Sequence, residues 1–163
     1  MAEPDPLAEL HPVLYRFALR ATRNPDVARD LAQEALLAAV AQRGEFANRS
    51  SLRTWVVGIL SHKVIDHFRK RSEQPLDGDE TAELVATPSA EDVERVVAAR
   101  QELAMVERAL EKLPALERLA LLMVDVEGID RENCCHDLGV TPTHLRVLLH
   151  RGRNRMRRML ENG

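Results

Sequence analysis

An aperiodic acidic segment divides this chain of 163 residues into two blocks with helical periodicity. Residues 72–94 contain eight carboxylates and no Lys or Arg. This segment is rich in Pro, Asp, Glu and Thr, and it lacks the regular apolar spacing of an element that packs on a core. We therefore expect residues 72–89 to form a flexible acidic linker with a root-mean-square span of about 25 Å. The chain is predicted to fold as two small units.

The composition favours helices for both units. The chain is 45% hydrophobic and 30% charged, with one Trp, one Tyr and three Phe. Ala, Leu, Glu and Arg are good helix formers, whereas the aromatic residues that favour strands are scarce. Apolar residues recur every three or four positions, which predicts helices at about 7–23, 25–43, 51–71, 89–113, 116–127, 131–138 and 142–160. The expected fold is all-α, with domains at 1–71 and 90–163 on either side of the linker.

The end of the chain has the pattern of a helix-turn-helix. A short helix is followed by a turn at Gly139 and by a longer helix that opens at Pro142. The net charge of the chain is −3, but residues 143–163 carry a local charge of +5. In this motif the second helix enters the DNA major groove, although a basic amphipathic helix can also simply be solvated. The residues expected to face DNA are Thr143, His144, Arg146, Val147, His150 and Arg151.

Motifs along the chain resemble the extracytoplasmic-function (ECF) sigma factors of bacterial RNA polymerase. Residues 26–34 (DVARDLAQE) and 51–70 (SLRTWVVGILSHKVIDHFRK) are similar to two segments of the first domain of that family. Residues 113–118 (LPALER), 127–128 (EG), 138–140 (LGV) and 149–153 (LHRGR) match its second domain in order and spacing. Each fragment is weak alone, but together they indicate the family.

This resemblance implies partners for both domains. The first domain would dock on the clamp helices of core RNA polymerase and melt the minus-ten promoter element, and the second would read the minus-thirty-five element. Further expected partners are the polymerase flap and an anti-sigma factor. Asp30, Gln33 and Glu34 would face the clamp, and Leu37 falls on the same helix face. Without the resemblance, these three polar residues would be interpreted as a solvated surface.

The resemblance also implies contacts to the melted DNA strand. A flipped base would bind the loop that ends at Ser51, because unstacking is offset by stacking and hydrogen bonds to the base edge. Trp55 is either a stacking platform or a large core residue. His62 stands where the family usually has Asn, and Val147 and Leu148 depart from its K-S-R pattern, so the promoter preference should be unusual. The expected strand contacts are Phe46, Asn48, Arg49, Ser50, Trp55, His62, Lys63, Arg69 and Lys70.

The consecutive residues Cys134, Cys135 and His136 suggest a metal or redox site, but a buried structural thiol is the better interpretation. Three neighbours on one helix point in different directions and cannot easily bind one ion together. The same geometry argues against a cysteine hydrolase. We expect no metal, no cofactor and no catalysis.

One alternative function stays open, a helix-turn-helix regulator that acts without docking on polymerase. Neither an apolar run of about 20 residues nor a signal peptide occurs in the sequence. The expected location is therefore the cytoplasm, with no membrane insertion.

Overall fold

The computed structural model describes residues 3–71 and 94–163, and in these ranges every regular element is a helix. The all-α prediction is thus confirmed. Residues 72–89, where the linker is predicted, lie outside the described residues. The first block contains α1 (Pro6–Glu9), α2 (His11–Thr22), α3 (Pro25–Ala41), the short 3-10 helix η1 (Arg43–Glu45) and α4 (Leu52–Arg71). The second contains α5 (Glu94–Glu111), α6 (Ala115–Leu121), the π-helical turn η2 (Leu122–Val126), α7 (Arg131–Leu138) and α8 (Pro142–Glu161).

The helix boundaries follow from local chemistry. Asn24 caps α3, since its side chain accepts hydrogen bonds from the backbone N–H groups of Asp26 and Val27, and Pro25 occupies the first helical position. One prediction is wrong. The helix expected at 7–23 is interrupted at Leu10, after which α2 starts with Pro12 in its first turn. Proline lacks the N–H that would continue the helix, so the chain restarts there.

The first core lies between α2, α3 and α4. Small residues on α3, including Ala28 and Ala32, are fully buried and let the neighbouring helices approach closely. Larger side chains such as Leu14 and Phe17 from α2 and Leu60 from α4 fill the remaining space.

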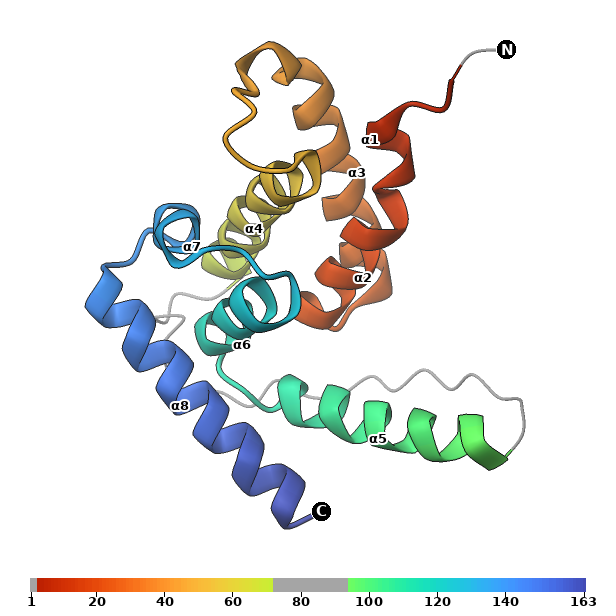
Figure 1. The fold of residues 1–163 in the computed structure, drawn as a ribbon, viewed down its shortest axis with the longest axis vertical. Helices are drawn as coiled ribbons and strands as arrows, with labels where there is room; N and C mark the ends of the chain where they lie inside the picture. Colours follow the sequence, from red (N-terminus) through yellow and green to blue (C-terminus); the bar gives the residue numbers. More distant parts are fainter. Residues whose placement is uncertain (1–2, 72–93) are drawn as a thin grey trace.

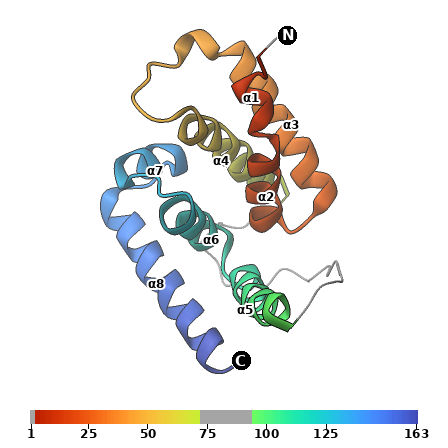
Figure 2. The same cartoon turned by 45° about the vertical axis from the view of Figure 1, so that its right-hand side comes forward.

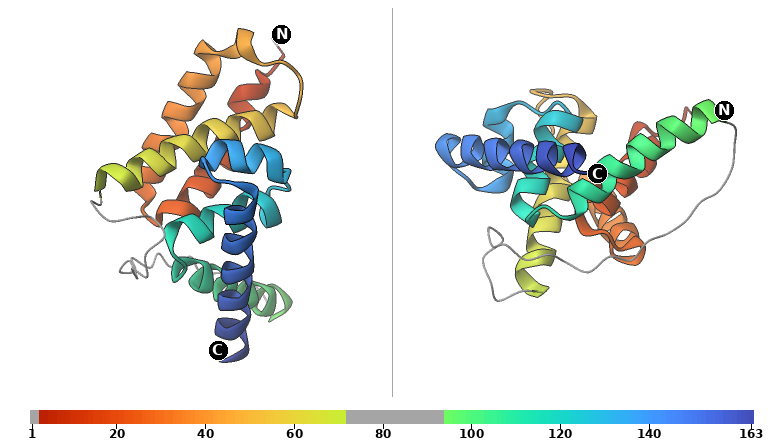
Figure 3. Two further views of the ribbon diagram at one scale, coloured as in Figure 1. Left: turned by 90° about the vertical axis from the view of Figure 1, so that its left-hand side faces the viewer. Right: turned by 90° about the horizontal axis from the view of Figure 1, so that it is seen from below.

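The second core is built around α6, which α8 covers on one side. Leu119, Met123, Leu145 and Leu149 are almost completely buried there. Gly152 of α8 is a point of close approach: a Cβ atom at this position would lie 3.1 Å from Leu121 Cδ1. The last turns of α8 pack on α5, where a Cβ atom at Gly163 would lie 3.5 Å from Met105 Cε, and Figure 3 shows the C-terminus beside α5.

The two blocks pack against each other directly. Helix α7 lies beside α4, and the turn between α5 and α6 meets the end of α2 (Figures 1 and 2). Arg118 of α6 is 4% exposed at this second contact. Its guanidinium donates hydrogen bonds to four carbonyl oxygens: Ala21, Leu110, Glu111 and Leu113. The first of these belongs to α2, so one buried side chain joins the two blocks.

Across residues 3–71 and 94–163, no helix combines the length and the apolar character needed to cross a membrane.

Candidate nucleic-acid interface

Helices α7 and α8 form the helix-turn-helix that the sequence predicts. Asp130 caps α7 by accepting a hydrogen bond from the Asn133 backbone N–H. Gly139 ends the helix with φ of 66°, a left-handed conformation that glycine adopts without strain. Thr141 then caps α8 by accepting from the His144 backbone N–H. These caps fix the angle at which α8 leaves the turn (Figure 3).

The start of α8 presents the residues expected to contact DNA. Leu145, Leu148 and Leu149 point into the core, so the other side of the helix faces solvent. His144 is half-buried, whereas the remaining candidates are exposed: Thr143, Arg146, Val147, His150 and Arg151. This surface combines a guanidinium, hydroxyl and imidazole groups, and an apolar side chain. Those groups can read base edges and thymine methyl groups.

Farther along α8, basic side chains contact the protein itself. Arg153 donates to Asp125 of η2 through Nε at 2.9 Å and Nη2 at 2.7 Å. Arg155 Nε lies 3.4 Å from Glu117 Oε2 on α6. The hydrogen bond that Arg153 donates to Asp125 raises the pKa of Arg153 above its ordinary value. These pairs attach the second half of α8 to α6 and η2, a role that the sequence analysis missed.

Helix α3 exposes the three residues that would face the polymerase clamp. Asp30, Gln33 and Glu34 all lie on its solvent side. Leu37 on the same face is 67% exposed, and Val40 one turn on is 58% exposed. Large apolar side chains at such exposure beside carboxylates are typical of a surface that binds another protein. The exposure of Val40 was not anticipated.

The loop between η1 and α4 brings two aromatic rings together. The ring centroids of Phe46 and Trp55 are 5.2 Å apart, with planes inclined by 38°. Trp55 packs on the first core, yet it is only partly buried. Asn48 adopts a left-handed backbone conformation with φ of 56°, and Ser51 caps α4 through Thr54. The predicted strand contacts from 46 to 55 therefore cluster at one end of α4 (Figure 3).

The remaining strand candidates lie along α4, and one of them is already paired. Lys63 is half-buried, while Arg69 and Lys70 are exposed in the last turn. His62 is half-exposed, and its Nε2 lies 3.4 Å from Asp137 Oδ1 of α7. The hydrogen bond with Asp137 raises the pKa of His62, which partial burial opposes. The pairing of His62 with Asp137 was not predicted from the sequence.

Cys134 is buried, as the sequence analysis expects of a structural thiol. It is 0% exposed, and its Sγ lies 3.9 Å from Met123 Sδ. Burial raises the pKa of the Cys134 thiol to about 12, so it stays protonated and unreactive at neutral pH. Cys135 is half-buried and His136 is exposed. The described ranges contain no group of three or more His, Cys, Asp or Glu side chains that could hold a metal ion.

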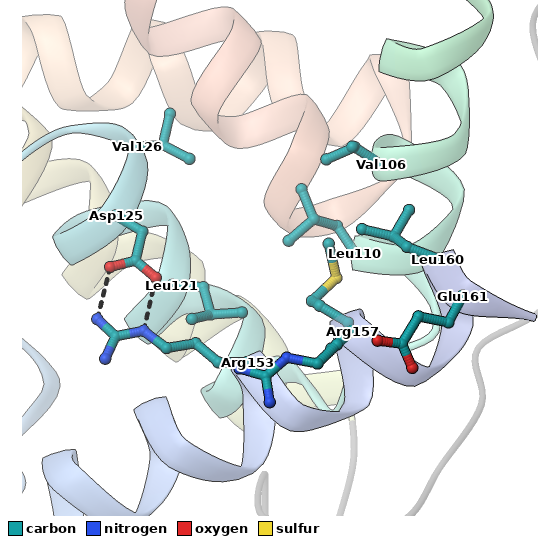
Figure 4. A pocket seen from close by; sticks show the side chains of 10 residues that line it. Val106, Leu110, Leu121, Asp125, Val126, Arg153, Arg157, Leu160 and Glu161 are labelled. Carbon is teal, nitrogen blue, oxygen red and sulfur yellow. Dashed lines mark hydrogen bonds and ion pairs between the residues drawn. The ribbon is translucent and has the colours of Figure 1, made fainter.

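An apolar groove of about 530 Å³ opens between α5, η2 and α8 (Figure 4). Arg153, Asp125, Arg157 and Glu161 place charges along its edge (Figure 4). The groove was not predicted, because it depends on how α5, η2 and α8 are arranged in space. Its apolar lining consists of Val106, Leu110, Leu121, Val126, Met156 and Leu160.

Comparisons with known proteins agree with this arrangement. Residues 7–74 match the family Sigma-70 region 2, and residues 103–156 match Sigma-70, region 4. ECF RNA polymerase sigma factor SigM of Mycobacterium tuberculosis is 29% identical over 92% of this chain and 72% of its own length. ECF RNA polymerase sigma factor EcfG of Rhodopseudomonas palustris is 29% identical over 96% of this chain and 83% of its own.

A solved structure is similar over almost the whole chain. The sigma factor RpoE from Bartonella quintana, in complex with the anti-sigma factor NepR, superposes with a TM-score of 0.73 and 28% identity. The similarity covers 95% of this chain and 94% of that one.

Two helical domains of this kind, the second with a helix-turn-helix, define a sigma factor, a transcription initiation factor of RNA polymerase. The chain belongs to the ECF sigma factors. It binds core RNA polymerase and directs promoter recognition. These findings support that function over the alternative of a regulator that acts without polymerase docking.

Proposed function

We propose that this sigma factor divides its work between two surfaces, with residues 1–71 as the polymerase-docking and strand-melting domain and residues 90–163 as the duplex-reading domain. The clustering of Phe46, Asn48, Arg49 and Trp55 at one end of α4 is the observation that carries this assignment. It places two rings and several hydrogen-bonding groups where an unstacked base could bind.

Polymerase docking uses the exposed face of α3 in this proposal. Asp30 and Glu34 supply negative charge for basic side chains on the clamp, and Leu37 supplies apolar contact beside them. Charge complementarity guides the encounter, and Leu37 adds affinity once the partner covers it. Arg69 and Lys70 at the end of α4 then contact phosphates of the melted strand.

The duplex is read by the start of α8. Arg146 and Val147 are exposed within the first two turns, where helix-turn-helix proteins contact base edges. Arg146 would pair with a guanine, and Val147 would contact a thymine methyl group. Because Val147 stands where the family usually has a polar residue, this chain should prefer an unusual upstream element.

Two further protein partners are proposed. The polymerase flap would contact the apolar groove between α5 and α8, and an anti-sigma factor would bind the chain, as NepR binds the similar sigma factor RpoE. In this proposal the chain catalyses no reaction itself, because transcription is the chemistry of the polymerase. It acts in the cytoplasm, where bacterial polymerase meets promoter DNA.

The test is gel filtration of the chain with core RNA polymerase, followed by promoter binding. The chain should co-elute with core polymerase and should bind promoter DNA tightly only in that complex. Tight, sequence-specific promoter binding by the free chain, without co-elution, would contradict the proposal.

A further inference from the structure

Helix α4 carries a notch on the side that faces α7, and one carboxylate fills it. The notch is Gly58, which is buried in the middle of α4. A Cβ atom at this position would lie 2.7 Å from Asp137 Oδ2 and 3.2 Å from Asp137 Cγ. The three heavy atoms nearest to that Cβ position all belong to Asp137. A side chain at this position would therefore meet Asp137 and force its carboxylate to move.

The presence of glycine here is costly for the helix itself. Glycine in a helix interior destabilises the helix relative to alanine, because glycine loses more conformational freedom on folding. Gly58 lies within a continuous helix and has an ordinary helical backbone conformation. The left-handed conformations that favour glycine therefore do not explain its presence. What it provides is room for the carboxylate of α7.

A second residue of α4 holds the same carboxylate. His62 lies one helical turn beyond Gly58, and its Nε2 is 3.4 Å from Asp137 Oδ1. The rings of His62 and His136 also meet edge to face, with centroids 6.4 Å apart. Thus Asp137 touches the notch with one oxygen and the imidazole with the other.

Further ion pairs join the two domains, including one at the start of α4 and one at the end of α2. Arg53 in the first turn of α4 pairs with Glu127, with Nη2 and Oε2 2.8 Å apart. Glu127 is 8% exposed, so this carboxylate is largely removed from solvent. At the end of α2, Arg23 pairs with Glu111 of α5 at 3.2 Å. Several ion pairs therefore hold the two domains together. Among the residues in these contacts, Asp137 is the one that fills the notch at Gly58.

We propose that the seating of Asp137 against Gly58 and His62 is an autoinhibitory latch, which closes the two domains on each other and withholds His62 and the α7-facing side of α4 from DNA. The inference rests on the proposed function, in which His62 contacts the melted strand. In the closed state the imidazole binds Asp137, and α7 lies along the helix that the strand must reach. Strand binding and the latch exclude each other, so the domains must separate before the promoter is opened.

Three variants test the latch in the full chain. Gly58→Ala puts a methyl group against Asp137, and Gly58→Leu adds a wedge that rotation of the Asp137 side chain cannot avoid. Asp137→Ala removes the carboxylate. Glu132→Ala is the matched control, because Glu132 is an exposed carboxylate on the same helix and its loss changes the net charge equally.

The first readout is the radius of gyration from small-angle X-ray scattering. Gly58→Leu and Asp137→Ala should expand the chain, whereas Glu132→Ala should match the wild type. In the Asp137→Ala background, Gly58→Ala should have no further effect. A Gly58→Leu chain as compact as the wild type would overturn the latch.

The second readout is the fluorescence anisotropy of a short labelled single-stranded DNA of randomised sequence. If the closed state withholds this side of α4, opening should tighten binding by roughly three- to ten-fold, since apparent affinity scales with the open fraction. Expansion without tighter binding would overturn the inhibitory role. Failure of the wild-type chain to co-elute with core polymerase would instead count against the proposed function, and would leave the scattering result standing.

Discussion

The guanidinium of Arg153 holds the carboxylate of Asp125 through two hydrogen bonds, 2.9 Å and 2.7 Å long. This bidentate pair joins the middle of the recognition helix to the π-helical turn that precedes the helix-turn-helix. Two parallel bonds fix the direction of the guanidinium as well as its position. Arg153 therefore binds another part of the protein, whereas Arg146, about two turns earlier on the helix, is exposed to solvent.

We therefore expect Arg146→Ala and Arg153→Ala to differ in DNA binding. Arg146→Ala should cost about 1–3 kcal/mol on the preferred upstream element and much less on altered elements, because it removes a base contact. Arg153→Ala should leave the dependence of binding on salt unchanged, because it contacts no phosphate. The measurement is binding of the polymerase complex to a panel of duplexes at several salt concentrations.

The same variants should differ in stability. Loss of the exposed Arg153 pair should lower the free energy of unfolding by up to about 1 kcal/mol, and Asp125→Ala should have little added effect in that background. In the DNA-binding measurement, an equal loss of affinity for every duplex in the Arg146→Ala variant would show that Arg146 only positions the helix.

Charge reversal on α3 should weaken polymerase docking without unfolding the chain. Replacing Asp30 and Glu34 by Lys, or Leu37 by Ala, changes only exposed side chains, so the melting temperature should stay nearly constant. Glu9→Lys on α1 is the control for a change of charge elsewhere. Co-elution with core polymerase is the measurement. Undiminished co-elution of the folded Asp30 and Glu34 variant would refute this docking face.

The intrinsic fluorescence of the chain should report on strand binding, because Trp55 is its single tryptophan. A base that stacks against the ring pair of Phe46 and Trp55 should change the emission when single-stranded DNA is added. Phe46→Leu keeps an apolar side chain but removes one ring, so it should weaken binding while the chain stays folded. Unchanged emission at saturating DNA would place the strand elsewhere.

The closed arrangement should be sensitive to pH through His62. Asp137 and Asp66 raise its pKa above 6.5, Arg69 opposes them, and the ring of His136 lies opposite. Because the pKa is raised in the closed state, the contribution of the ion pair is fully present below about pH 6.5 and is lost as pH rises through the raised value. The radius of gyration should therefore increase from about pH 6 to about pH 8.5.

The His62→Asn variant is the control for that titration, since asparagine keeps a hydrogen-bonding group but carries no proton in this range. Its radius should change less with pH than that of the wild type. An equal pH response in both chains would assign the titration to another group.

The buried Arg118 should be essential for stability. Its guanidinium satisfies four carbonyl oxygens, and desolvation by burial, with repulsion from Arg23, lowers its pKa to about 10. Arg118→Ala would remove the guanidinium donor from the Ala21 and Leu113 oxygens, at a cost of about 2 kcal/mol or more. The Glu111 oxygen would keep a hydrogen bond from Arg23, and the Leu110 oxygen would keep one from the Leu113 backbone N–H. Urea denaturation measures this loss. A decrease below about 1 kcal/mol would mean that water replaces the guanidinium.

Periodicity and capping residues predicted most of the helices, because these signals are local. Asn24, Gly139 and Thr141 act at the helix ends where the sequence places them. The break at Leu10 could have been foreseen from Pro12, which stops a helix wherever it falls beyond the first turn. The π-helical turn at 122–126 could not, since it has no comparable sequence signal.

Contacts between segments far apart in the sequence could not be predicted from hydrophobic periodicity or capping residues. The ion pair of Arg153 and Asp125 was not predicted, because no sequence signal links two residues on different helical elements. The contact of Gly58 with Asp137 likewise has no sequence signal, because it depends on how α7 packs against α4. The exposed faces of α3 and α8 were predictable because each is set by the buried side of its own helix. The partners of their side chains depend on the tertiary packing.

The central claim is that this chain gives core RNA polymerase its promoter specificity. The most direct measurement is run-off transcription from a library of genomic fragments by core polymerase, with and without the chain. The account predicts discrete transcripts that appear only with the chain and start downstream of a shared pair of sequence elements. Transcripts that are identical in the two reactions, from a folded chain that co-elutes with the polymerase, would contradict it.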